Sequence, residues 1–188
     1  MADLLREIGV KCQRALQVGN LVSLHELSIK LGITIPTVEK YIDLLEKTFV
    51  IFSLGAFTSN SRNEIRKSRK YFFYDTGIRN AVINNFSQPE NRNDMGVLWE
   101  NFCIAERMKI NHLKTGVANM FFWRTYDGAE IDLVEESDGK LVAYEFKWNA
   151  KKQPGIPVSF KAKYQTDQLF VVNPDNFLQF FICREYQP

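Results

Sequence analysis

Cysteine and histidine are scarce in this sequence, and it has no long apolar run. Its three cysteines, Cys12, Cys103 and Cys183, are far apart and odd in number, which predicts free buried thiols in a reducing cytoplasm rather than a disulfide framework. No CxxC pair or histidine cluster suggests a zinc site. No apolar stretch approaches the roughly 20 residues of a membrane span, and the first residues lack a signal-peptide pattern. We therefore expect a cytoplasmic protein with no membrane partner.

A large excess of one charge is also lacking, so the bulk charge excludes little. The formal net charge is +2 at pH 7, and only the distribution of the charges can indicate a nucleic-acid partner. Hydrophobic residues make up 45% and charged residues 24%, as in ordinary globular proteins, and fifteen phenylalanines argue against disorder. The 188 residues suffice for one ordinary domain or two small ones.

The first part of the chain, residues 1–85, has the pattern of a winged-helix domain. The spacing of its apolar residues predicts three helices, over residues 3–17, 22–32 and 34–48. Ser23 is a candidate N-cap and Gly32 a helix end, so the second and third helices form a helix-turn-helix. Two predicted strands follow, "FVIFSL" and "KYFFYD". The polar loop between them would be the wing, at residues 58–70.

The predicted wing is the most basic segment and the candidate nucleic-acid contact. Five cations, opposed only by Glu64, lie within nine residues: Arg62, Arg66, Lys67, Arg69 and Lys70. The third helix is a poor reader of DNA, because acidic residues balance its lysines and leave no positive face for phosphates. The wing could equally be a structural connector, and the sequence leaves both interpretations open.

The second part, residues 95–188, has the pattern of a mixed sheet flanked by helices, after a boundary in the polar stretch "SQPENRND". The expected order is a long helix at 95–113, strands at 119–125, 130–135 and 140–147, a helix near 158–165, and the strands "QLFVVN" and "QFFICR". Asp138-Gly139 is a dipeptide typical of tight hairpins. The whole chain is therefore predicted to be α/β, or α+β overall.

Charged residues interrupt this hairpin where a strand interior would normally be apolar. Asp132 lies on the first strand, beside Glu130 on the same face. Glu145 and Lys147 share one face of the second strand, roughly 7 Å apart by the rise per residue. Glu100 lies near the start of the preceding helix. A solvated sheet face with cross-strand ion pairs would explain one Glu-x-Lys alone.

The helical Glu100, the strand Asp132 and the Glu145-x-Lys147 motif, in this order, resemble the PD-(D/E)xK nuclease superfamily. The resemblance implies a restriction-endonuclease-like fold in which Asp132, Glu145 and Glu100 hold Mg²⁺ or Mn²⁺ and Lys147 is the catalytic base or stabiliser. These residue types suit the chemistry, because phosphodiester hydrolysis needs a hard cation and such cations prefer carboxylate oxygens. The signature proline before Asp132 is absent, as is common in the superfamily.

Most of the chain is also similar to the C-terminal portion of a family of bacterial and archaeal AAA+ ATPases. In that family an ATPase module precedes a winged helix and a restriction-endonuclease-like domain. Five blocks carry the resemblance in order: "SLHELSIKLGITIPTVEKYIDLLEKTFVIFSL", "KSRKYFFYDTGIRNAVI", "GVLWENFCIAE", "FFWRTYDGAEIDLV" and "YEFKW". This chain lacks the GxxxxGK[ST] phosphate loop. It is expected to be a fragment or to have lost the module, and to meet ATP only through a separate ATPase module.

Two functions from different classes follow. The first is a nucleic-acid-associated protein with a metal-dependent, nuclease-like domain that hydrolyses phosphodiester bonds of DNA. The alternative is a non-catalytic module of an AAA+ ATPase that binds DNA or a protein partner. The intact set of candidate residues favours the enzyme, whereas the acidic face of the helix-turn-helix favours the binding module.

Overall fold

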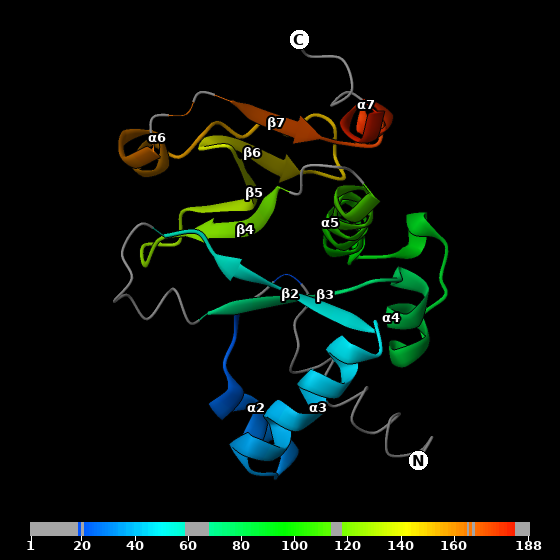
Figure 1. Ribbon diagram of the computed structural model, residues 1–188. Helices are drawn as coiled ribbons and strands as arrows, with labels where there is room; N and C mark the ends of the chain where they lie inside the picture. The colour runs from blue at the N-terminus through cyan, green and yellow to red at the C-terminus, as the bar shows by residue number, and fades with distance from the viewer. Residues whose placement is uncertain are drawn as a thin grey trace.

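A computed structural model describes residues 19, 21–58, 68–113, 118–164, 166 and 168–182 (Figure 1). Within them, one mixed sheet has the strand order β1-β3-β2-β4-β5-β6-β7. The strands are β1 (Leu21–Val22), β2 (Ile51–Ala56), β3 (Arg69–Phe73), β4 (Asn119–Arg124), β5 (Glu130–Ser137), β6 (Lys140–Phe146) and β7 (Leu169–Val172). The α-helices are α2 (Leu24–Leu31), α3 (Ile35–Lys47), α4 (Thr76–Ile83), α5 (Met95–Leu113), α6 (Val158–Tyr164) and α7 (Phe177–Ile182), and η2 (Pro89–Asn91) is a 3-10 helix. The predicted α+β fold class is confirmed.

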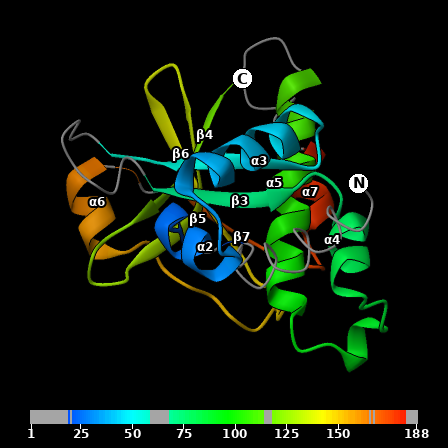
Figure 2. The ribbon, with the colours of Figure 1, turned by 90° about the horizontal axis from the view of Figure 1, so that it is seen from below.

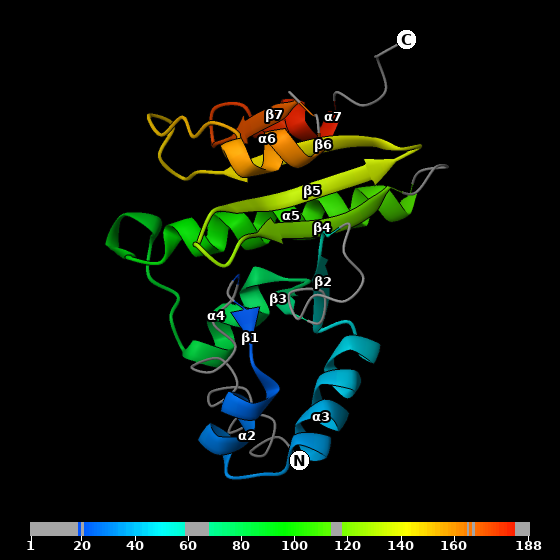
Figure 3. The ribbon, with the colours of Figure 1, turned by 90° about the vertical axis from the view of Figure 1, so that its left-hand side faces the viewer.

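Helices α2 and α3 form as predicted, because their caps are encoded locally. The hydroxyl of Ser23 accepts a hydrogen bond from the amide of Glu26, and Gly32 ends α2 with a left-handed φ of 67°. The hydroxyl of Thr34 caps α3 by accepting from the amide of Thr37. Figure 3 shows both helices below the sheet, away from β4 to β7. The helix predicted at residues 3–17 lies outside the described residues.

The two predicted parts of the chain share one sheet. β2 and β3 form the expected antiparallel hairpin, and β2 also pairs in parallel with β4 through Gly55–Phe121 and Ala56–Phe122. Helix α5 is fixed to β3 by Asn101, whose side-chain amide exchanges two 2.8 Å hydrogen bonds with the backbone of Phe73. The larger apolar core contains buried residues from both parts. The site described below therefore draws on both.

Helices cover both faces of the sheet, so both faces are apolar. Helices α5 and α7 lie on one side and α6 on the other (Figures 1 and 2). On β6, Tyr144 and Phe146 belong to the core under α5, whereas Ala143 belongs to the smaller core around Phe160 of α6. This is the face alternation expected for that strand.

A tight turn and a bulge set the geometry of the β5–β6 hairpin. Asp138 and Gly139 both have positive φ, 52° and 74°, as a type I′ turn requires. On the other side of β5, Phe121 pairs with Val134 while Trp123 pairs with Ile131. One residue of β4 therefore lies opposite two residues of β5, which is a β-bulge at positions 132 and 133. A bulge of this kind changes the direction in which a side chain points. One of the two residues of this bulge is Asp132, a predicted site acid.

The prediction of a strand at residues 179–184 is wrong for residues 179–182, which belong to helix α7, and residues 183 and 184 lie outside the described residues. Asn176 precedes the helix and its side-chain oxygen accepts from the amide of Asn173. Phe177, Phe180 and Phe181 have the spacing of one helical face. Phe177 packs on Trp99 of α5, with ring centroids 5.6 Å apart. The sequence was misleading because a short apolar run has no clear period.

Two predictions from composition can be followed in the described residues. Cys103 is a buried free thiol, and Cys12 and Cys183 lie outside the residues described. Burial raises the pKa of the Cys103 thiol above its ordinary range. In the described part of the chain, no helix combines the length and apolar character needed to cross a bilayer.

Candidate active site at a fork in the sheet

Strands β5 and β6 separate at one end of their hairpin and leave a fork. The last backbone pair between them is Leu133–Tyr144. Beyond it, β6 continues beside β7, while the start of β5 stays paired with β4. The amide of Phe146 donates to Oδ2 of Asp132 at 2.9 Å instead of to a backbone carbonyl. The carboxylate of Asp132 therefore takes the place of a backbone hydrogen-bond acceptor where the two strands separate.

Three of the predicted site residues meet in this fork. The Nζ of Lys147 lies 3.1 Å from Oδ2 of Asp132 and 2.5 Å from Oε2 of Glu145. The backbone amide of Lys147 donates to the carbonyl of Val172 at 2.9 Å, which fixes the residue beside β7. The side chains of Asp132 and Glu145 are 12% and 8% exposed, so both acids are largely removed from water.

Glu100 is the fourth predicted residue, and α5 brings it to the same cluster. Its side chain is 17% exposed, and its Oε1 is buried without a hydrogen-bond partner among the described residues. The nearest cation is Nζ of Lys70, 3.8 Å away. The backbone of Gly19, at φ 77°, approaches so closely that a Cβ there would lie 3.0 Å from Oε1. A residue larger than glycine would crowd this carboxylate.

The burial of Lys70 contradicts its predicted contact with nucleic acid. It is 1% exposed, forms an ion pair with Glu130, and lies 5.3 Å above the ring of Phe122. Consecutive strand residues face opposite sides, so β3 exposes Arg69 and turns Lys70 inward. Arg69 therefore stays a candidate for phosphate contact, and Arg62, Arg66 and Lys67 lie outside the described residues.

Glu130 also belongs to the cluster. The sequence indicated it only as a neighbour of Asp132 on the same strand face. It pairs with Lys70 and, at 3.6 Å, with Arg124 at the rim. We call the whole group the fork cluster, which consists of Glu100, Glu130, Asp132, Glu145, Lys70 and Lys147. Four carboxylates thus face two lysines, and the excess is acidic.

The acid excess changes the protonation of the cluster. Burial, followed by the charge of Asp132, raises the pKa of Glu100 to about 8 and that of Glu145 to about 7. Burial would lower the pKa of Lys147, but the charges of Asp132 and Glu145 outweigh it and raise that pKa. The fork cluster therefore retains protons near neutral pH, and a cation entering it would displace them.

The carboxylate oxygens of the fork cluster are of the type that binds a hard divalent cation, although they are not arranged around one common point. Carboxylate oxygens are the preferred ligands of Mg²⁺ and Mn²⁺, and one buried oxygen of Glu100 has no hydrogen-bond partner among the described residues. In the described part of the chain, no three His, Cys, Asp or Glu side chains are grouped to hold a metal. The ammonium of Lys147 instead occupies the space between Asp132 and Glu145.

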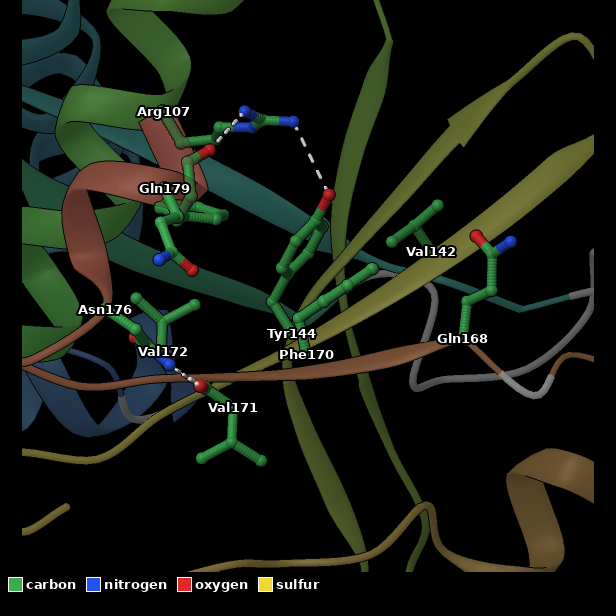
Figure 4. Close-up of a pocket in the computed structure, with 10 residues that line it drawn as sticks. Arg107, Val142, Tyr144, Gln168, Phe170, Val171, Val172, Asn176 and Gln179 are labelled. Carbon is green, nitrogen blue, oxygen red and sulfur yellow. Dashed lines mark hydrogen bonds between the residues drawn. The ribbon is translucent and has the colours of Figure 1, made fainter. Parts of the chain in front are cut away.

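A second ionic cluster lies further along α5, and no sequence pattern predicted it. Arg107 donates from Nε and Nη2 to the two carboxylate oxygens of Glu135, at 2.7 and 2.9 Å. It also donates to the hydroxyl of Tyr144 and to the carbonyl of Phe180. Figure 4 shows this guanidinium above Tyr144 at the side of a cavity of about 350 Å³ beside β7. We call Arg107, Glu135 and Tyr144 the Arg107 cluster.

Together the fold and the fork cluster define an α+β protein with an acid-rich site where two strands of one sheet part. Two family matches cover this chain. Residues 13–89 match a domain of unknown function (DUF8612), and residues 95–183 match a domain of unknown function (DUF4143). The second of these is a domain found in AAA-ATPase-associated proteins. Glu100, Asp132, Glu145 and Lys147 fall in the second match, whereas Lys70 falls in the first.

Two relatives from Mycobacterium align with most of this chain. An uncharacterized protein of Mycobacterium tuberculosis and one of Mycobacterium bovis are each 28% identical to this chain over 131 residues. The aligned segment is 69% of this chain and 29% of each relative, so the chain spans less than a third of their length. No solved structure matches the chain significantly.

Proposed function

We propose that the fork cluster is a metal-dependent phosphodiesterase site of the PD-(D/E)xK type, acting on nucleic acid. The observation that supports it is the meeting of Asp132, Glu145 and Lys147 in the fork, with Glu100 behind them. These residues come from three elements and are up to 47 positions apart in the sequence. Surface ion pairs give no reason to bury so many acids at one point, since burial of unbalanced charge is costly.

In this proposal Asp132, Glu145 and Glu100 would hold a magnesium or manganese ion. Such an ion, when bound, supplies positive charge against the phosphate and lowers the pKa of its water. Lys147 has a raised pKa and is therefore protonated, so it would leave its position between the two acids and donate a hydrogen bond to the attacking water or to the phosphate. Lys70, which pairs with Glu130, also lies 3.8 Å from Oε1 of Glu100 and offsets part of its charge.

A second candidate function is a non-catalytic binding module. One observation favours it: Lys147 already bridges Asp132 and Glu145, so the fork can be stable without any metal. The link of DUF4143 to AAA-ATPase-associated proteins fits such a module, which would bind DNA or a protein partner for a separate ATPase. ATP would then bind the separate module only.

Thermal melting with and without manganese tests the proposal. At a concentration about 100-fold above the dissociation constant, metal should add about 2.7 kcal/mol, or roughly 5–10 °C for a domain of this size. Asp132→Asn should abolish the shift. Lys147→Ala should keep the shift and lose cleavage, because the lysine acts on the water rather than on the ion.

Glu136→Gln is the matched control, because Glu136 is also on β5 but its carboxylate accepts a hydrogen bond from Asn119 at the surface, outside the fork cluster. It should retain both the shift and cleavage. Cleavage is assayed on single-stranded, duplex and branched DNA and on RNA. No manganese shift in the wild type, together with no cleavage of any substrate, would reject the enzyme in favour of the binding module.

A further inference from the structure

A second cavity, of about 260 Å³, lies at the turn between β4 and β5, next to the fork. Its lining residues come from β4, this turn and helix α6, among others. Helix α6 lies on the side of the sheet away from α5 (Figures 1 and 2). We call it the turn pocket. Its volume is at the small end for ligand sites, so it suits one flat ring system better than an extended ligand.

Aromatic side chains form much of the turn pocket. Phe57 and Tyr164 pack with ring centroids 4.9 Å apart, and Trp123 forms part of the lining. Tyr126, in the turn itself, is 71% exposed. The hydroxyl of Tyr164, another lining residue, is buried and has no hydrogen-bond partner among the described residues. An exposed ring in the lining of a partly polar, aromatic cavity suits stacking of a planar heterocycle.

The charges around the turn pocket suit a phosphate attached to that heterocycle. Arg124 and Lys163 line it, against the single acid Asp127. Thr58 also lines it, and the sequence runs from Thr58 directly into the basic segment that contains Arg62, Arg66 and Lys67. Aromatic rings combined with positive charge are typical of sites that hold single-stranded nucleic acid.

The turn pocket also borders the fork cluster. Arg124 faces Glu130 in the β4–β5 ladder, and Nη1 of Arg124 lies 3.6 Å from Oε2 of Glu130. Glu130 in turn pairs with Lys70 and is two residues from Asp132. A nucleotide with its base in the turn pocket would therefore place its backbone near the acids.

We propose that the turn pocket binds one unpaired base, so that the substrate of the fork cluster is single-stranded or locally unpaired nucleic acid. This inference rests on the proposed function. A base inside a duplex cannot enter such a cavity without leaving its stack, which costs energy, whereas an unpaired base enters freely. Stacking on one aromatic ring is worth roughly tenfold to a hundredfold in affinity.

Binding without cleavage tests the inference directly. Fluorescence anisotropy in EDTA compares a labelled single strand of about 12 nucleotides with a duplex of equal length, a size range typical of such sites. Tyr126→Ala should weaken single-strand binding about tenfold or more and leave duplex binding unchanged. Tyr126→Phe keeps the ring and should bind as the wild type does. Lys163→Gln should weaken single-strand binding and lower its salt dependence.

Phe86→Ala is the control, because Phe86 is similarly exposed, at 67%, but lies in the segment after α4. It should bind both strands as the wild type does. Equal effects of Tyr126→Ala on single strand and duplex, no effect on either, or no single-strand binding even at low salt would each overturn the inference. Tyr126 is exposed, so an unchanged melting temperature of the variant excludes unfolding as the cause.

The same measurements separate this inference from the proposed function. If Tyr126→Ala removes single-strand preference but no metal shift or cleavage is found, the turn pocket stands and the enzyme fails. If cleavage depends on Asp132 but is indifferent to Tyr126 and to strand pairing, the enzyme stands and the turn pocket fails.

Discussion

Two ionic clusters link α5 to the sheet, and their charges are balanced differently. Arg107 and Glu100 come from the same helix, seven residues and so about two turns apart. In the Arg107 cluster one guanidinium meets one carboxylate, and both oxygens of Glu135 accept hydrogen bonds. In the fork cluster four carboxylates face two lysines, and Oε1 of Glu100 lacks a hydrogen-bond partner in the described part of the chain.

The Arg107 cluster therefore holds α5 on the sheet, whereas the fork cluster still has groups that can bind a ligand. A balanced, bidentate pair has no group left to offer a ligand. An acidic cluster that retains protons near neutral pH can exchange them for a cation, which is why perturbed acids gather at functional sites. The same helix therefore provides a fixed contact at one point and a candidate site two turns away.

The largest expected effect comes from breaking the balanced pair. Arg107→Ala removes the bidentate contact to Glu135, which is 1% exposed, and should lower the free energy of unfolding by about 3–5 kcal/mol. Urea denaturation measures the loss. The double variant Arg107→Met with Glu135→Leu removes both charges and should lie within about 1–2 kcal/mol of the wild type. A single variant that costs less than the double would contradict this pairing.

A smaller effect is expected at Lys70, where the fork cluster loses a cation. Lys70→Met keeps the buried stem over Phe122 and removes the ammonium, at a cost of about 2 kcal/mol, because Glu130 still pairs with Arg124. The more negative cluster should then gain more from manganese than the wild type does. Lys109→Met is the control, since Lys109 pairs with Glu106 at the surface. An unchanged manganese shift in Lys70→Met would separate Lys70 from the candidate site.

Local patterns predict much of the site, and long-range pairing accounts for most of what they miss. The Asp138-Gly139 turn and the alternation along β6 are enough to predict that Asp132, Glu145 and Lys147 lie close together. The partner of Lys70 is harder to predict, because Glu130 is 60 residues away and β2 must first pair with β4. Strand alternation does require Arg69 and Lys70 to face opposite sides, so one of the two could have been excluded from the predicted phosphate contact on the sequence alone.

The Arg107 cluster could not be predicted for a related reason. Glu135 lies on the same strand as Asp132, but the bulge at positions 132 and 133 disturbs the simple alternation that would assign its face. Nothing in the helix pattern of α5 distinguishes Arg107 from a solvent-facing arginine. The pair becomes visible only when α5 is placed on the sheet.

The last expected effect is a pH dependence of the fork cluster, which is the smallest of the three over any single pH unit. Burial and the charge of Asp132 raise the pKa of Glu100 from 4.5 to about 8, so the folded protein keeps a proton that the unfolded chain loses near its ordinary pKa. Metal-free protein should therefore lose stability as the pH rises between these two values, by at most about 1.4 kcal/mol per pH unit for one proton. Urea unfolding in EDTA across this range measures the slope.

Glu100→Gln should reduce this slope and raise stability near pH 8, because the variant has no proton to lose. Glu106→Gln, on the same helix but paired with Lys109 at the surface, should keep the wild-type slope. Manganese should stabilise the wild type more at pH 8 than at pH 6, since metal ligands must be deprotonated. If Glu100→Gln keeps the full slope, the retained proton resides elsewhere, and Glu145, whose pKa is raised to about 7, is the next position to change. If the manganese effect is the same at both pH values, proton exchange in the fork cluster is not linked to metal binding, and the contrast with the Arg107 cluster is one of stability only.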